Sequence, residues 1–345
     1  MTKYSLSFVV ATRNDDHGGN MSNKIKLFIN TWTKLVKKYN SNFELIIVDW
    51  NSPKKKGSIR NNFKFKKIKS KSSIKIVEIR ESEHKKLLNS KKLNFYQMIA
   101  KNIGAKCASS KRLLITNIDI IFSEKIFQKL NTLSQKYNEI YRATRYDVNI
   151  KNFKNINENY LDKKVTRINY PNYTFEVKKN KYYKIKSNLI DYIKKIFTTN
   201  YFKIFFELNF FSIIKTFIDF FKNNLFTNAC GDFILINKKF FFKIGGFYEF
   251  QGYSWNIDNF FMWQAFYKKA KFKNFQEKIY HLDHKSGSGY TAGSKSLFLK
   301  LDKKKINYIN NYELFKLIFY FRKDKNFLKK KQRTPKINFS IHNVS

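Results

Sequence analysis

The side chains best suited to chemistry lie where apolar runs of the sequence are interrupted or end. Asn117 and Asp119 interrupt the apolar run 113–122, and Asp49 ends the run 43–49. Continuous apolar runs are typical of strands inside a parallel sheet, and open α/β sheets bind ligands where such strands end. Because carboxylate oxygens are good ligands for divalent cations, we expect Asp119 to help hold a metal ion and a diphosphate.

Three further side chains have the right chemistry and leave alternatives open. Asp258 precedes apolar residues at helical spacing, so it is expected near a helix N-terminus. There it serves either as an N-cap residue or as a catalytic base. His281 and His284 lie at a predicted strand end, before a glycine-rich loop. Such histidines either bind a metal or are hydrogen-bonded inside the core.

The elements that position these residues can be read from periodicity. Predicted strands cover 6–11, 43–49 and 74–79, and predicted helices cover 22–39 and 94–109. Within 113–122 we predict a buried strand that ends at Asn117-Ile118-Asp119, with another apolar run behind it. In the first helix Ile25, Phe28 and Trp32 recur at helical spacing. Strands alternating with helices predict an α/β fold with a mostly parallel sheet, flanked by helices and joined by right-handed crossovers.

In this order the motifs resemble the nucleotide-sugar-binding half of GT-A-fold glycosyltransferases of the family-two kind. The matching segments are a strand before Thr12-Arg13-Asn14, a strand ending in Val48-Asp49, Lys101-Asn102-Ile103-Gly104-Ala105, and Thr116-Asn117-Ile118-Asp119. The resemblance implies a Rossmann-like GT-A sheet and a nucleotide-sugar donor. It also implies that the nucleotide site is lined by Thr12, Arg13, Asn14, Asp49 and Asn102.

The resemblance further implies a divalent cofactor, Mn²⁺ or Mg²⁺. Asp119 matches a metal-binding Asp of the family's Asp-x-Asp motif, whereas Asn117 stands where the first Asp usually is. An amide keeps an oxygen acceptor but lacks the charge, so the metal would have fewer anionic ligands. In the broader fold the position of His281 and His284 often supplies a metal-binding histidine.

Later motifs match the acceptor side of the same family. Gly231-Asp232 precedes a predicted strand and resembles a Gly-Asp that lies beside the donor or acceptor sugar. The segment 240–247 resembles a turn that contains two glycines. Asp258 matches the place of the catalytic base. The resemblance therefore implies an inverting transfer in which Asp258 takes the proton of the acceptor hydroxyl.

We expect four parts in the chain: a nucleotide-sugar-binding half (1–147), an insertion (148–226), an acceptor and catalytic half (227–294), and a basic C-terminal helical extension (295–345). Within the insertion, 196–226 is rich in aromatic residues and has a narrow polar stripe. The pairs Lys203–Glu207 and Lys215–Asp219 are spaced to support a helix. Such an apolar helix belongs either to the core, to a homodimer interface, or to a membrane surface.

The amino-acid composition limits which classes of binding partner are expected. The chain has a net charge of +44, 43% hydrophobic residues, and only two Cys and three Pro. The charge suggests nucleic acid or an anionic membrane, but Lys is spread along the whole chain, and a codon bias toward A and T explains most of it. No nucleic-acid-binding motif is present, so we expect no specific nucleic-acid partner.

The two cysteines and the lack of a secretory leader favour a cytoplasmic protein, peripheral at most on the cytoplasmic membrane face. No membrane-spanning segment is expected. The favoured function is transfer of a sugar to a glycan or lipid-linked acceptor, in the synthesis of a surface polysaccharide. The alternative is a non-catalytic GT-A-like module that binds a nucleotide or a glycan.

Overall fold

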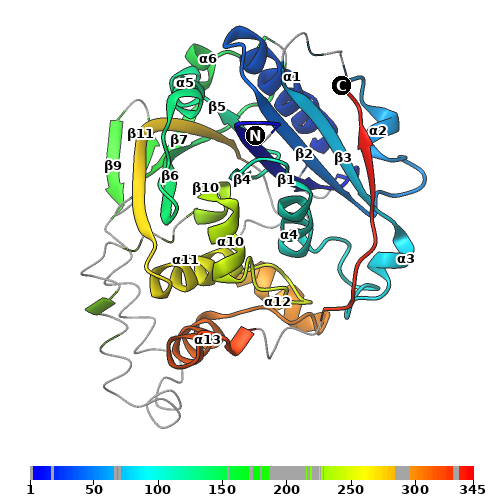
Figure 1. Ribbon diagram of the computed structural model, residues 1–345, viewed down its shortest axis with the longest axis vertical. Coiled ribbons are helices and arrows are strands. Elements are labelled where there is room, and N and C mark those ends of the chain that lie inside the picture. Colours follow the sequence, from blue (N-terminus) through cyan, green and yellow to red (C-terminus); the bar gives the residue numbers. More distant parts are fainter. Residues whose placement is uncertain are drawn as a thin grey trace.

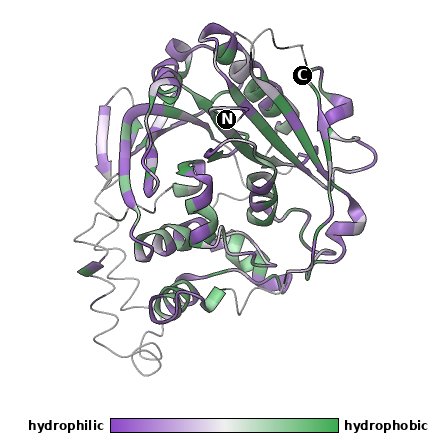
Figure 2. Cartoon of the chain, in the orientation of Figure 1, coloured by the Kyte–Doolittle hydropathy of each residue, from purple (hydrophilic) through white to green (hydrophobic). Residues whose placement is uncertain are grey.

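The computed structural model describes residues 3–16, 19–65, 68, 71–153, 155–170, 174–178, 181–185, 215, 218–219, 225, 227, 229–283, 295–328 and 334–345. Within these residues, twelve strands form one sheet with helices on both faces (Figure 1). The predicted α/β class, with a mostly parallel central sheet flanked by helices, is confirmed. Figure 2 shows apolar strands through the middle of the molecule and hydrophilic outer surfaces on many of the helices.

Four parallel strands form the centre of the sheet. These are β1 (Leu6–Thr12), β2 (Phe43–Trp50), β3 (Ser73–Ile79) and β4 (Arg112–Thr116), in the order β3-β2-β1-β4. Every residue of β1 and β2 is buried. Burial on both faces explains why these strands are continuous apolar runs in the sequence.

Two hydrophobic cores lie on opposite faces of this sheet. Val9 and Ile46 pack toward α4 (Gln97–Cys107), whereas Phe8 and Leu45 pack toward α1 (Met21–Lys38). Helix α4 lies very close to the sheet, because a Cβ on Gly104 would come within 2.6 Å of a Val9 methyl carbon. Gln97 and Lys101, in the N-terminal half of α4, donate to Asn117 in the turn that follows β4.

The sheet continues beyond β4 with strands from later in the sequence. Strand β10 (Phe233–Asn237) runs antiparallel to both β4 and β6 (Glu139–Val148), so β4 and β6 point in the same direction. Strand β11 (Lys271–Leu282) is parallel to β6. The carboxyl ends of β1–β4, β6 and β11 therefore lie at one edge of the sheet, as expected for a ligand site. An antiparallel extension follows β6 and consists of β7 (Val165–Asn169), β8 (Thr174–Lys178) and β9 (Lys181–Ile185).

The strand that was expected to end at Asn117-Ile118-Asp119, with another apolar run behind it, is confirmed. The run divides into β4 and β5 (Ile120–Phe122), and residues 117–119 form a turn between them. Strand β5 leaves the β4 ladder and pairs with β11 instead. The physical reason is the polar Asn-x-Asp sequence, which closes a tight turn with a hydrogen bond from the Ile120 amide to the Asn117 carbonyl (3.3 Å).

The remaining described helices cover the two faces and the edges of the sheet. Helices α10, α11, α12 and α13 contribute to the core on the α4 side, and α5 contributes to the core on the α1 side. The set comprises α2 (Ile59–Asn62), α3 (Glu81–His84), α5 (Glu124–Thr132), α6 (Glu158–Asp162), a 3₁₀ turn η1 (Cys230–Asp232), α10 (Lys238–Ile244), α11 (Ile257–Tyr267), α12 (Lys295–Lys303) and α13 (Asn311–Lys323).

The C-terminal extension packs onto the domain. Leu297 and Leu301 of α12 and Leu314 and Ile318 of α13 are buried in the core on the α4 side. The chain ends in β12 (Ser340–Asn343), an edge strand on β3 that the sequence reading did not predict. The basic run 329–333 and most of the aromatic segment 196–226 lie outside the described residues. The four-part division of the chain stays a prediction.

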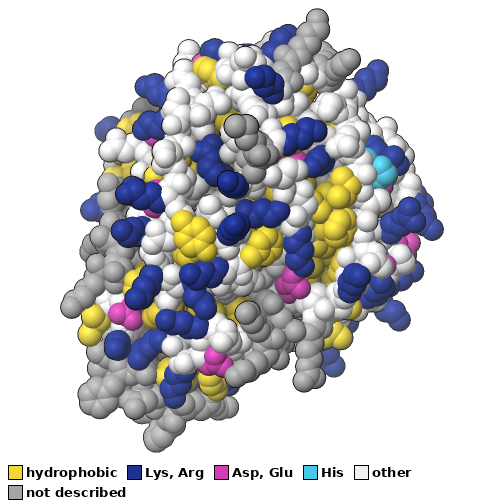
Figure 3. All heavy atoms as spheres, viewed as in Figure 1, with side chains coloured by type: hydrophobic (Ala, Val, Ile, Leu, Met, Phe, Trp, Pro, Cys, Tyr) yellow, Lys and Arg dark blue, Asp and Glu magenta, His cyan; other side chains and the backbone are white. Residues whose placement is uncertain are grey.

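No helix in the described part of the chain is long and apolar enough to cross a membrane. Lys and Arg side chains are spread over the visible face rather than gathered in one patch (Figure 3). This distribution agrees with a charge that comes from overall composition.

Candidate active site

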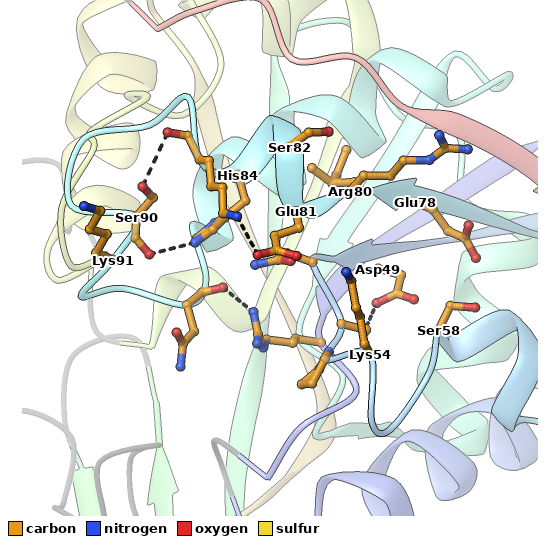
Figure 4. Close-up of a pocket in the computed structure, with 17 residues that line it drawn as sticks. Asp49, Lys54, Ser58, Glu78, Arg80, Glu81, Ser82, His84, Ser90 and Lys91 are labelled. Atoms are coloured by element: carbon orange, nitrogen blue, oxygen red, sulfur yellow. Dashed lines mark hydrogen bonds and ion pairs between the residues drawn. The ribbon is translucent and has the colours of Figure 1, made fainter.

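A cleft of about 890 Å³ lies at the carboxyl ends of β1, β2 and β3 (Figure 4). Two residues predicted to bind a nucleotide, Arg13 and Asp49, line it. Asn14 braces its wall, because its side-chain amide donates to the carbonyls of Lys56 and Gly57 (both 2.9 Å). Thr12 is fully buried at the end of β1. The structure thus brings the loops after β1 and β2 together, as the sequence predicted.

Asp49 is a buried carboxyl held by short-range hydrogen bonds. It is 2% exposed, and it accepts from the Ser52 hydroxyl and from the Ile59 amide (2.7 Å). Burial raises the pKa of Asp49 to about 6, because the charged form loses hydration and these hydrogen bonds offset only part of the loss. The group therefore changes charge close to neutral pH.

Arg13 and His84 stand on other sides of the same cleft. The Arg13 guanidinium donates to Asp15 (2.5 Å) and to the carbonyl of Asn94 (2.9 Å). His84 Nδ1 must accept from Trp50, because an indole N–H can only donate (3.0 Å). Its Nε2 then donates to the Ser90 carbonyl (3.0 Å). Burial also lowers the pKa of His84, which agrees with a neutral ring.

A second polar cluster, here called the Asn117 cluster, lies at the end of β4. It consists of Lys101, Asn117, Asp119, Arg145, Asp147, Asp232 and His281. Asn117 sits between a cation and an anion: its Oδ1 accepts from Lys101 (2.6 Å) and Gln97 (2.9 Å), and its Nδ2 donates to Asp232 (2.6 Å). A carboxylate at this position has no N–H to give Asp232, which is a physical reason for the amide.

Lys101 is a buried lysine inside this cluster. Its side chain is 0% exposed, and its ammonium donates to Asn117 and to the Gly231 carbonyl (3.1 Å). Burial lowers the pKa of Lys101, while the charges of Asp232, Asp258 and Asp119 oppose this effect. Three predicted site carboxylates therefore surround one internal cation.

Asp119 and His281 face each other, as predicted for a shared ligand site. The distance from His281 Nε2 to Asp119 Oδ2 is 3.7 Å, and the Leu282 amide donates to the Asp119 carbonyl (2.9 Å). The buried lysine Lys24, on α1, interacts electrostatically with Asp119. These contacts exist because β5 pairs with β11, which brings the Asn-x-Asp turn beside the end of β11.

His281 is held from behind by Asp147. The distance from its Nδ1 to Asp147 Oδ1 is 3.0 Å, and Arg145 binds the same carboxylate through Nε (2.8 Å). Burial by itself would raise the pKa of Asp147, but the His281 hydrogen bond and the Arg145 charge outweigh burial and lower the pKa to about 2.

Asp258 lies in the first turn of α11, as expected, and points at the turn before β10. Its Oδ2 accepts from the Gly231 amide (3.0 Å) and its Oδ1 from the Asn259 amide (2.9 Å). A Cβ on Gly231 would come within 2.9 Å of Asp258 Oδ2, so a side chain there would disturb the carboxylate. Position 231 thus favours glycine, which lets the Asp258 carboxylate approach the backbone closely.

The predicted nucleotide-site residue Asn102 has a structural role away from the cleft. Asn102 clamps the turn after α10, donating to the Phe247 carbonyl (2.8 Å) and to Glu249 (3.0 Å) and accepting from the Phe247 amide (2.9 Å). It supports the predicted two-glycine turn, where Gly245 and Gly246 have positive φ. His284 lies outside the described residues.

The oxygen and nitrogen atoms of the site determine whether it can hold a divalent metal. Among the described residues no group of three or more His, Cys, Asp or Glu side chains is arranged to hold a metal ion. Asp119 and His281 form a pair, and one ion can contact atoms 3.7 Å apart because metal bonds to nitrogen and oxygen are about 2.1 Å long. The pair therefore fits two positions of a metal site.

Sequence reasoning missed several residues of the cluster. Lys101 begins the matching segment 101–105, but the resemblance gives it no role. Arg142, Arg145 and Asp147 occupy β6, where charged residues in an otherwise buried strand were a usable signal. Such residues are buried only when paired. Arg142 does lie close to the Asp232 and Asp258 charges, and it donates to the Phe233 carbonyl (3.1 Å).

No protein-family model matches the chain, and no curated protein sequence matches it. Solved structures similar to it include GalNAc-T7 with UDP, GalNAc and Mn²⁺ (TM-score 0.47, 12% identity, 86% of this chain). The catalytic domain of Drosophila β1,4-galactosyltransferase 7 in complex with xylobiose has a TM-score of 0.35 and 8% identity over 79% of this chain. S. aureus TarS 1–349 has a TM-score of 0.42 and 11% identity over 81%.

The chain spans 46%, 64% and 60% of the lengths of those three chains. Because all three TM-scores are below 0.5, the function proposed next rests on the geometry of the site.

Proposed function

We propose that this protein is a GT-A-type glycosyltransferase that transfers a sugar from a nucleotide-sugar donor to a glycan or lipid-linked acceptor, with inversion. One observation carries the proposal. The Asp49 cleft and the Asn117 cluster lie at the same edge of one sheet, at the carboxyl ends of neighbouring strands. A nucleotide in the cleft would direct its diphosphate along this edge toward Asp119.

The Asp49 cleft supplies what a nucleotide needs. The Asp49 carboxylate, when ionised, would accept a hydrogen bond from a base N–H. Arg13, which follows β1 and lines the cleft, supplies a positive charge. Lys54, Arg80 and Lys91, also in the lining, add positive charge that favours a polyanionic ligand (Figure 4). The cleft therefore favours a nucleoside diphosphate over a neutral ligand.

A divalent metal would be held by Asp119 and His281, with His284 as a further predicted ligand. A metal at this position supplies Lewis-acid stabilisation of the leaving diphosphate. Lys24 adds positive charge beside Asp119, and the Asp119 charge opposes the burial that lowers the pKa of Lys24. Asp147 and Arg145 orient His281 from the other side.

The acceptor would be activated by Asp258. Its carboxylate is oriented by two backbone N–H groups, those of Gly231 in the turn before β10 and of Asn259 in the first turn of α11, so the side chain is fixed before substrate arrives. A carboxylate in this position takes the proton of an acceptor hydroxyl as that hydroxyl attacks the sugar. Asp232, tied to Asn117 and Arg145, is proposed to lie beside the sugar.

A second function, a non-catalytic nucleotide- or glycan-binding module, is favoured by one observation. The Asn117 oxygen accepts from two internal donors, so it is committed within the protein rather than presented to a metal. A module of this kind would keep the Asp49 cleft and lack transfer.

Donor hydrolysis separates the two functions. The full chain is incubated with UDP-, GDP- and CMP-sugars and Mn²⁺, and released nucleotide is measured. A glycosyltransferase releases nucleotide from at least one donor, faster when an acceptor is added. Nucleotide binding without release from any donor would contradict the enzyme and support the binding module.

We also propose that the protein works in the cytoplasm, at the face of an anionic membrane where a lipid-linked acceptor would lie. The net charge of +44 supports attraction to anionic lipid. Flotation with anionic liposomes, with and without residues 196–226, tests this proposal. Unchanged flotation of the deletion variant would rule out that segment as the contact, and a dimer seen by light scattering would support an interface between two copies instead.

A further inference from the structure

The end of β6 carries an ion-pair network that the sequence-based site did not include. Strands β6 and β11 are parallel, and their register pairs His281 with Asp147 and Ile279 with Arg145. One guanidinium joins two carboxylates: Arg145 Nη1 binds Asp232 (2.6 Å), and its Nε binds Asp147 (2.8 Å). The network thus connects the proposed sugar side of the site to His281.

Asp147 is a buried carboxylate surrounded by hydrogen-bond donors. It is 5% exposed. Its Oδ2 accepts hydrogen bonds from Arg145 Nη2 (3.1 Å) and from the side-chain amide of Asn169 (3.0 Å), and its Oδ1 forms an ion pair with Arg145 Nε (2.8 Å). Arginine and the amide nitrogen can only donate, so the Asp147 oxygens act only as acceptors. The proton in the remaining contact, to His281 Nδ1 (3.0 Å), must therefore belong to the histidine.

This contact determines which nitrogen of His281 faces Asp119. With the proton on Nδ1, the neutral ring carries its lone pair on Nε2, which lies 3.7 Å from Asp119 Oδ2. The opposite tautomer would turn an N–H toward Asp119 and could not bind a cation there. A carboxylate behind a histidine is a recurrent way to fix such a ring.

We propose that Asp147, anchored by Arg145, is a positioning residue that holds His281 with Nδ1 protonated and Nε2 aimed at the cation position beside Asp119. The inference rests on the proposed function for the identity of the ligand, a divalent cation that carries a diphosphate. The tautomer itself is a property of the protein alone and can be measured without any ligand.

Asp147→Asn is the informative substitution. An amide nitrogen in place of Oδ2 would oppose two hydrogen-bond donors, Arg145 Nη2 and Asn169. In place of Oδ1 it would oppose the ring of His281, and it would lose the ion pair with Arg145 Nε. Only histidine can change from donor to acceptor, so the amide nitrogen should take the Oδ1 side. His281 then accepts at Nδ1 and moves its proton to Nε2.

The first measurement is ¹⁵N NMR of histidine-labelled full-length protein without metal at mildly alkaline pH. The chain has five histidines, so the His281 signals are assigned by their loss in His281→Gln. We expect the Nδ1–H tautomer in the wild type and the Nε2–H tautomer in Asp147→Asn. An unchanged Nδ1–H signal in a folded Asp147→Asn protein would overturn the proposal.

The second measurement is Mn²⁺ affinity by EPR titration. Loss of such a carboxylate typically weakens metal binding about 10–100-fold, and we expect a loss of that size in Asp147→Asn. The matched control is Asp162→Asn. Asp162 is an exposed carboxylate that contacts Tyr280 (2.8 Å) and Lys278 (2.5 Å) on the same strand but does not contact His281. We expect its Mn²⁺ affinity to equal that of the wild type.

A third variant covers the case in which Asp147→Asn does not fold. Asn169→Ala removes one donor to Asp147 and leaves the charges intact, and we expect a weaker Mn²⁺ affinity with the Nδ1–H tautomer retained. Mn²⁺ affinities of Asp147→Asn and Asn169→Ala equal to the wild type would contradict the proposal. Protein that shows these effects but releases no nucleotide from any donor would contradict the proposed enzyme and leave the positioning role supported.

Discussion

The two polar regions at the carboxyl edge of the sheet bury carboxylates in opposite ways. In the cleft, Asp49 is held by a hydroxyl and a backbone amide, and burial raises its pKa to about 6. In the Asn117 cluster, Asp147 is buried almost as deeply, but Arg145 and His281 lower its pKa to about 2. Burial penalises a charge, and at Asp147 the His281 hydrogen bond and the adjacent Arg145 cation outweigh that penalty.

The difference suits two kinds of ligand. A carboxyl group with a pKa close to neutral pH, such as Asp49, can lie beside a neutral nucleobase in either its protonated or its ionised form. A cluster of alternating acids and cations keeps its charges and can present a constant field to a metal ion and a diphosphate. The following predictions test whether the two regions differ in this way.

Asp258→Asn should have the largest effect on activity, because it removes the proposed catalytic base, which lies beside the Asn117 cluster. We expect the transfer rate to fall about 10²–10⁴-fold, with the affinity of the Asp49 cleft for nucleotide unchanged. Steady-state transfer assays and calorimetric binding measure the two quantities. A variant with full transfer activity would show that Asp258 is a helix N-terminal residue without a catalytic role.

Lys101→Met should cost the most stability. The change leaves the Asp119, Asp232 and Asp258 charges without their internal cation. Breaking a buried charge arrangement costs about 3 kcal/mol, and we expect the free energy of unfolding in urea to fall by that amount. Lys106→Met, at an exposed position of the same helix, is the matched control and should unfold like the wild type.

Asn117→Asp should destabilise the protein, although it restores the family's usual motif. The new carboxylate loses the hydrogen bond to Asp232 and repels that side chain across a former 2.6 Å contact. The expected loss is about 1–3 kcal/mol, as for a buried group left without its partner. Asn30→Asp, at an exposed position of α1, provides the control. Equal or greater stability of Asn117→Asp would mean that the amide is not selected by Asp232.

The smallest effect concerns the pH response of the cleft. A base N–H needs the ionised Asp49, so the affinity for a nucleoside should rise about tenfold between pH 5 and pH 7 as a group of pKa about 6 loses its proton. Nucleosides are used because they carry no titrating phosphate. Binding by Asp49→Asn should not vary over this range, and a flat wild-type profile would refute the role of Asp49.

The same titration has an opposite effect on folding. The pKa of Asp49 is raised in the folded state, so its protonated form favours folding at low pH. That contribution is fully present below the ordinary pKa of about 3.9 and is lost as pH rises through about 6. Asp49→Asn should remove this decline from the pH dependence of stability. Ligand affinity and protein stability should thus change in opposite directions with pH.

Much of the fold could be predicted because it depends on local pattern. The boundaries of β1, β2, α1 and α11 follow from runs of apolar residues and from helical spacing, both of which are visible in the sequence. The positions of Asp49, Asp119 and Asp258 at element ends follow from the same pattern. The partner of the apolar run 120–122 could not be predicted, because β5 pairs with β11, about 160 residues later.

The sequence by itself determined the α/β class and the polar groups at the strand ends. Only the tertiary structure decided how those groups are charged and connected. His281 meets Asp119 and Asp147 because β11 pairs with both β5 and β6, and Asn117 is an amide that bridges Lys101 and Asp232. Hydrogen bonds and pKa values depend on neighbours from distant parts of the chain, whereas strands and helices depend mainly on residues close in sequence.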